Sequence, residues 1–233
     1  MAFASPRTMT PVIQEDEQTR SAFLIRVYQH LGLAVAAFIV FETFLFMTGI
    51  AEGLYNFLAG ASSAWLLVLG AFMVVNVMTD RAANNIQSTG VQYAGLFGLA
   101  AAEALIFAPF LYYVFNTDGA GTVGAAAFVT LVGFAGLTAV AMLTKSDLSF
   151  LRPFVMFGGI MALVGIVGSV IFGFHLGVWF SVAMVALAGA AILYQTQNIV
   201  RQYPAWAHVG AAVRLFGSLM TMFWYVLRIF SDR

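Results

Sequence analysis

The chain has 233 residues, of which 62% are hydrophobic and only 9% are charged, with ten basic residues, ten acidic residues and no cysteine. Ordinary soluble domains devote about a quarter of their residues to charge, so a chain of this composition must expose much of its apolar surface to lipid. The composition therefore predicts an integral membrane protein. The net charge of zero argues against a nucleic-acid partner. The absence of cysteine excludes a disulfide framework and a cysteine metal site.

Seven long apolar runs follow one another along the chain, and about twenty apolar residues are enough for a helix to cross the hydrocarbon layer. They are continuous and rich in Gly and Ala, without the apolar–polar alternation that is typical of membrane β-barrels. The sequence predicts an all-α integral membrane protein, with a seven-helix membrane domain over residues 22–233. The runs lie at residues 22–48, 64–79, 92–115, 122–144, 151–173, 176–197 and 209–230.

Basic residues share one side of this seven-helix arrangement, and Lys and Arg in short loops stay on the cytoplasmic side of a membrane. The segments on the other side contain no Lys and no Arg. They are residues 49–63, 116–121 and 174–175. This asymmetry predicts a cytoplasmic N-terminus and a C-terminus on the far side. Arg228 and Arg233 run against the pattern, and a short, tilted or re-entrant last helix would account for them. The basic side carries Arg7, Arg20, Arg81, Lys145, Arg152 and Arg201.

Residues 1–21 form a polar segment that contains Pro6 and Pro11. The segment lacks the apolar core of a cleavable signal peptide, so the first apolar run is expected to be an uncleaved membrane helix. Its composition is too polar to pack a core, which predicts a mobile cytoplasmic tail.

Two carboxyl groups fall inside apolar runs. Glu103 lies near the middle of the run at 92–115. A carboxyl at this depth is expected to be neutral unless it faces water or a cation, because removal from water disfavours the charged form. Glu103 is therefore either a proton or cation group facing the bundle interior, or a neutral side chain bonded to a neighbouring helix. Glu42, near the end of the first run, is expected to reach the far interface and be solvated.

Further polar side chains close the run at 176–197 and enter the last run. Arg214 lies one turn into the last run, and a buried cation needs a partner, so we expect it to pair with acceptors such as Gln195 and Gln197. The three histidines fall on different runs or loops, which predicts no metal site. The chain contains no HExxH, GxSxG or phosphate-loop motif, so neither an enzyme nor a cofactor is expected.

Two stretches carry a resemblance to a known family. Residues 143–151 read L-T-K-S-D-L-S-F-L, including Lys145 and Asp147, and residues 192–200 read I-L-Y-Q-T-Q-N-I-V. The first resembles the T-[KR]-x-D-[LM]-S-F-L loop of the Bax inhibitor 1, or transmembrane BAX inhibitor motif, membrane proteins. The second is similar to that family's I-L-[YF]-[DE]-T-x-x-I segment. The resemblance extends over the whole membrane part and implies a seven-helix bundle with a central last helix.

Within the family the likeness is to the bacterial YccA-like branch, whose segments ILFETSNII and SLYVSLYNIFVSLL resemble ILYQTQNIV and RLFGSLMTMFWYVL here. This likeness implies a location in the bacterial inner membrane. In calcium-leak members of the family, two aspartates from helices six and seven form a pH-sensitive latch at the cytoplasmic mouth. The matching positions here are Gln195 and Ser218, and neither side chain ionises. The candidates for a gate are therefore Gln195, Gln197, Arg214 and Ser218.

The resemblance implies two kinds of function. YccA-like proteins are associated with the membrane-bound AAA protease FtsH, which pulls on their tails, so residues 1–20 are expected to be an extractable handle and the chain a modulator of that protease. The alternative is a pH-sensitive leak for calcium or protons, with Glu103 as the titrating group. A third interpretation is an accessory subunit of a larger membrane complex.

Overall fold

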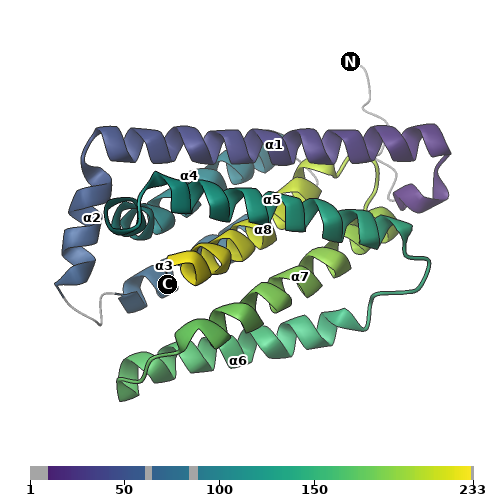
Figure 1. Ribbon diagram of the computed structural model, residues 1–233. Helices are drawn as coiled ribbons and strands as arrows, with labels where there is room; N and C mark the ends of the chain where they lie inside the picture. The colour runs from purple at the N-terminus through teal and green to yellow at the C-terminus, as the bar shows by residue number, and fades with distance from the viewer. Residues whose placement is uncertain (1–9, 61–64, 84–88, 232–233) are drawn as a thin grey trace.

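The computed structural model describes residues 10–60, 65–83 and 89–231 (Figure 1). Within these ranges the chain forms a short 3-10 helix and eight α-helices and no named strand, which confirms the predicted all-α class. The elements are η1 (Val12–Gln14), α1 (Glu17–Met47), α2 (Ile50–Ala59), α3 (Trp65–Ala83), α4 (Thr89–Thr117), α5 (Ala120–Leu143), α6 (Leu151–Phe172), α7 (Gly177–Gln202) and α8 (His208–Ser231).

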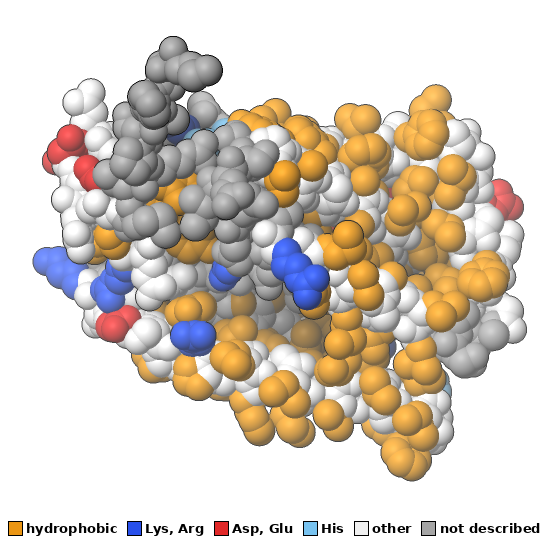
Figure 2. All heavy atoms as spheres, turned by 180° about the vertical axis from the view of Figure 1, so that it is seen from behind, with side chains coloured by type: hydrophobic (Ala, Val, Ile, Leu, Met, Phe, Trp, Pro, Cys, Tyr) orange, Lys and Arg blue, Asp and Glu red, His pale blue; other side chains and the backbone are white. Residues whose placement is uncertain are grey.

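Six helices are long and apolar enough to cross a membrane, namely α1 and α4 to α8. The helix α3 contributes a shorter apolar stretch, Leu66–Val75. Hydrophobic side chains cover most of the face shown in Figure 2, and Lys and Arg gather toward one end of it. The chain is therefore a multi-pass membrane protein.

The helix α2 was not predicted, because it lies in residues 49–63, which we expected to be a connecting loop. Gly49 has a φ of 75°, a left-handed conformation that glycine adopts without strain, and it lets the chain turn sharply between α1 and α2. Ala51 and Leu58 are buried. At ten residues α2 is too short to cross a bilayer, so a search for long apolar runs does not find it.

The first long helix begins at Glu17 rather than at residue 22. Asp16 caps it, because its carboxylate accepts a hydrogen bond from the backbone N–H of Thr19 at 2.6 Å. The acidic side chain of Glu17 in the first turn also favours a helix start. Local capping therefore extends α1 into polar sequence that hydropathy alone assigns to the tail.

The last helix, α8, packs against α1, α3, α4, α5 and α7. In the most apolar 18-residue stretch of α8, 72% of the residues are buried. In the corresponding stretch of α6, only 6% are buried. Aromatic rings join three of the helices: Phe107 of α4 stacks on Phe223 of α8 at 5.5 Å between centroids and meets the edge of Phe38 of α1 at 5.4 Å. These contacts hold α8 against its neighbours through well-packed apolar side chains.

Candidate functional site

Gln197, on the last turns of α7, holds the loop formed by residues 144–150. Its side-chain oxygen accepts a hydrogen bond from the backbone N–H of Leu148 at 2.7 Å, and its amide nitrogen donates to the carbonyl of Ser146 at 2.8 Å. The same nitrogen lies 3.5 Å from the carbonyl of Thr144. Gln197 is only 7% exposed, so one buried amide fixes three points of the loop.

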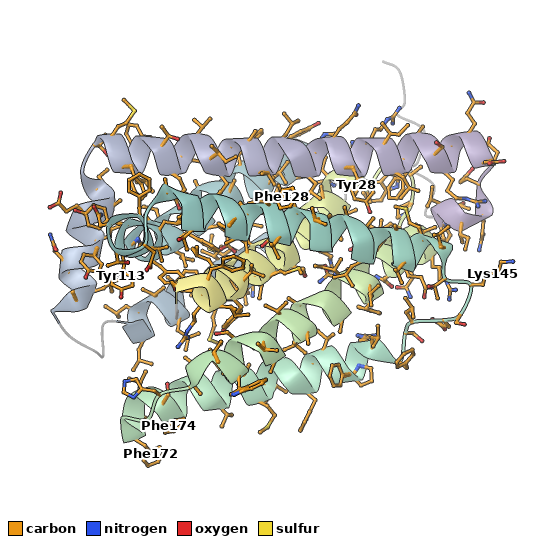
Figure 3. The ribbon with its side chains drawn as sticks, viewed as in Figure 1. Tyr28, Tyr113, Phe128, Lys145, Phe172 and Phe174 are labelled. Atoms are coloured by element: carbon orange, nitrogen blue, oxygen red, sulfur yellow. The ribbon has the colours of Figure 1, made fainter. Side chains whose placement is uncertain are left out.

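Asp147 makes the second attachment of this loop. Its carboxylate pairs with Arg201 of α7 at 3.1 Å and accepts the backbone N–H of Ser149 at 2.9 Å. The hydrogen bonds from the backbone and side chain of Ser149, together with the charge of Arg201, lower the pKa of Asp147. The carbonyl of Lys145 lies 3.4 Å from a guanidinium nitrogen of Arg201, and Figure 3 shows the Lys145 side chain pointing away from the bundle.

Two of the candidate gate residues, Gln195 and Ser218, lie in direct contact. The hydroxyl of Ser218 on α8 donates a hydrogen bond to the side-chain oxygen of Gln195 on α7, at 2.9 Å. The guanidinium of Arg214 lies 5.9 Å from the centre of the Tyr203 ring, in cation–π range. The bond between Gln195 and Ser218 carries no titratable group, so this pair is a neutral lock between α7 and α8.

The N-terminal segment is attached to the turn that follows α7. The backbone N–H of Val12 in η1 donates to the carbonyl of Tyr203 at 2.8 Å, and Pro11 forms a bridge with Pro204. The Val12 side chain is fully buried. The described part of the predicted tail is thus docked on the turn between α7 and α8, whereas residues 1–9 lie outside the described residues. We call the end that contains η1, residues 144–150 and residues 203–207 the docking end.

Glu103 lies in the bundle interior, away from the docking end contacts. It is 0% exposed, and its carboxyl oxygens have no hydrogen-bond partner among the described residues. It lies in the wall of a cavity of about 550 Å³. The structure therefore supports the interior position that we predicted but describes no bond to a neighbouring helix.

Glu42 corrects the prediction of a solvated side chain at the interface. It is only 7% exposed, and neither carboxyl oxygen has a partner among the described residues. The helices α4, α5 and α8 pack around it and leave a second cavity of about 260 Å³. The position of Glu42 along α1 predicts its depth in the membrane but not the direction in which its side chain points.

Sequence reasoning missed one polar cluster, formed by His30, Tyr93 and His208. The Nε2 atom of His30 lies 2.7 Å from the Tyr93 hydroxyl, and its Nδ1 atom lies 2.6 Å from the carbonyl of Arg26. The rings of His30 and His208 are 4.9 Å apart. The histidines were expected on different runs or loops, and their sequence separation gave no sign that α1 and the start of α8 bring His30 and His208 into contact.

The contacts of Gln197 and Arg201 with the loop at 144–150 join the two stretches on which the family resemblance rests, namely the loop and the end of α7. A family model described as "Inhibitor of apoptosis-promoting Bax1" matches residues 20–233. The chain belongs to the Bax inhibitor 1 family. Proteins similar to this chain come from several bacteria.

A protein of Neisseria meningitidis described as uncharacterized is 28% identical over 180 residues, which cover 75% of this chain and 77% of the relative. A similarly described protein of Pseudomonas aeruginosa is 30% identical over 143 residues, or 58% of this chain and 61% of the relative. A third, from Campylobacter jejuni, is 34% identical over 154 residues, or 59% and 62%. The resemblance inferred from the loop and from α7 is thus confirmed at the level of the family.

Proposed function

We propose that this Bax inhibitor 1 family member is a membrane-anchored modulator of an ATP-driven membrane protease of the FtsH type, which engages its N-terminal tail. The observation that carries the proposal is the docking of Val12 on Tyr203. A pulling force on the tail reaches this contact first. It then acts on the turn between α7 and α8, next to the neutral lock.

The role needs an anchor that resists extraction. Several contacts at and near the docking end would have to break one after another before the chain could be extracted. The Val12 side chain is buried, Gln195 and Ser218 join α7 to α8, and Gln197 joins α7 to the loop at 144–150. Beyond them α8 is packed against five helices. A protease that grips the tail would stall against this structure, and no catalytic residue is required.

Replacing residues 2–9 by a Gly/Ser segment of equal length tests the handle while leaving the docked segment intact. Native membranes that contain the protease are solubilised in mild detergent, and co-purification and turnover of the chain are measured. The proposal predicts weaker association and slower turnover for the replaced tail. Equal association and turnover of both proteins would refute it.

We further propose that the bundle has seven spans in a bacterial inner membrane, with α3 as the seventh, α8 at the centre and the docking end in the cytoplasm. The apolar stretch Leu66–Val75 supports a role for α3 as a shorter span. The extensive burial of α8 supports its central place. Lys145 and Arg201 at the docking end support the cytoplasmic side, because basic residues stay there.

A second candidate function is a cation or proton leak, and the buried carboxyl of Glu103, which has no hydrogen-bond partner among the described residues, favours it. Ionisable groups inside membranes often mark ion pathways. The neutral lock of Gln195 and Ser218 would then act as the gate at the docking end. In liposomes loaded with a calcium- or pH-sensitive dye, a leak of this kind predicts slower flux for Glu103→Gln. Identical flux in the parent and the variant would rule out Glu103 as the titrating group.

A further inference from the structure

The larger of the two cavities described above, the one that Glu103 borders, lies between several helices of the bundle. Its walls come from α3, α4, α6, α7 and α8, and its volume is about 550 Å³, within the range of about 300–1,000 Å³ that is typical of ligand pockets. The walls are mostly apolar. Representative wall residues are Leu69 and Phe72 of α3, Ala162 and Leu163 of α6, and Met184 of α7.

The deep wall offers an apolar surface to an occupant, although Glu103 belongs to it. Glu103 borders the cavity, but its side chain is 0% exposed and its two carboxyl oxygens are buried. Phe107 and Met220 line the same region and are themselves almost fully buried. A hydrocarbon chain that enters the cavity therefore meets side-chain carbon rather than a charged carboxylate.

Positive charge is placed at one end of this cavity. Arg228, on the last turn of α8, lines it together with His175 from the connection between α6 and α7. Arg228 has no carboxylate partner among the described residues. The ion pair found in that part of the chain joins Arg201 to Asp147. Phe174, labelled in Figure 3 near the same connection, and Leu176 are also at this end.

We propose that this cavity binds one phospholipid with an anionic headgroup, whose phosphate lies at Arg228 and His175 and whose acyl chain lies between α3 and α6. Basic groups beside apolar pockets between membrane helices suit anionic lipid headgroups, because the phosphate supplies the countercharge that lipid tails cannot. The site also explains Arg228, the basic residue near the C-terminus that runs against the charge asymmetry of the loops. It is independent of the function proposed for the tail.

The test measures lipid binding to the delipidated full chain in detergent, by native mass spectrometry and by the shift of the melting temperature. Phosphatidylglycerol is the probe, and phosphatidylcholine and oleate are the comparison ligands. The proposal predicts preferential binding of phosphatidylglycerol. Loss of the Arg228 charge in Arg228→Gln should weaken phosphatidylglycerol binding at least about tenfold, because it removes a charge-assisted hydrogen bond to the phosphate.

A second variant tests the acyl-chain part of the site. Gly159 lines the cavity and a Cβ atom there meets nothing within 4 Å, so Gly159→Phe can fill the space without a backbone clash. It should reduce phosphatidylglycerol binding, whereas Gly124→Phe on α5, also with nothing within 4 Å, and Arg152→Gln should leave it unchanged. Equal binding of all three ligands, or unchanged binding in both Arg228→Gln and Gly159→Phe, would overturn the proposal.

Discussion

Gln197 is the side chain on which the attachment of the loop at 144–150 depends. Its amide replaces water for one backbone N–H and two backbone carbonyls of the loop. Backbone acceptors and donors have no signature in the sequence, so the role of this glutamine could not be predicted. The contact of Gln195 with Ser218 joins two positions that were predicted from the sequence as candidates for a gate, one at the end of α7 and one inside α8.

The first prediction concerns Gln197→Ala, which leaves the loop's polar backbone groups without their partner. An unsatisfied buried polar group costs about 1–3 kcal/mol, so the variant should melt at a lower temperature than the parent. Hydrogen exchange at residues 146–148 should rise. Gln202→Ala, at the exposed end of α7, is the matched control and should behave as the parent. A parent-like exchange pattern in Gln197→Ala would show that the loop is held by other contacts.

Asp147 gives the loop a pH dependence with a definite sign. Its pKa is lowered from 3.8, chiefly by the hydrogen bonds from Ser149 and then by Arg201. A carboxyl with a depressed folded-state pKa adds stability above its unfolded pKa and loses it as the pH falls through the folded value. The difference in melting temperature between the parent and Asp147→Asn should therefore stay constant at neutral pH. It should shrink below a pH of about 3.8. A difference that changes between pH 6 and pH 8 would contradict this assignment.

Among the secondary-structure elements, η1 attaches the N-terminal segment to the turn between α7 and α8. The sequence predicted all the long helices, because a run of apolar residues long enough to span lipid is a strong signal. It did not predict α2, the early start of α1 or the docking of η1. Each of these depends on a local feature, namely the left-handed Gly49, the cap of Asp16 and the burial of the single side chain of Val12.

The docking of η1 is tested by Val12→Asp. Burying a valine side chain contributes about 1.5–3 kcal/mol, and a carboxylate in its place disfavours the docked state further. Hydrogen exchange at residues 12–15 should therefore rise, and protease sites near Arg20 should become accessible. Ile13→Asp is the matched control, because Ile13 is 42% exposed and should tolerate the charge. Equal protection in the two variants would contradict the docking.

At the scale of the whole molecule, the orientation can be measured directly because the natural chain has no cysteine. Single cysteines are introduced at Gln202, at the docking end, and at Asn116, at the opposite end of α4, both exposed. With a membrane-impermeant maleimide, Asn116→Cys should label in intact cells and Gln202→Cys only after permeabilisation. The reverse pattern would place the docking end outside and remove the tail from the cytoplasmic protease.

The sequence foresaw the membrane bundle and the family but only part of the candidate site. Polar residues inside apolar runs were recognisable as candidates, and Glu103 is indeed interior. Their partners depend on which helix faces which, and helices such as α1, α4 and α5 are apolar on nearly all sides, so periodicity does not specify their neighbours. The contact of His30 with His208 and the burial of Glu42 are consequences of that packing.

Whether the docked tail links a protease to a stable anchor is measured by the turnover rate of the chain in membranes that contain the active protease. Three proteins are compared: the parent, the chain with residues 2–9 replaced, and Val12→Asp. The account predicts the slowest turnover for the replaced tail and the fastest for Val12→Asp, because the handle is lost in one and its attachment is released in the other. Equal turnover of all three would contradict it.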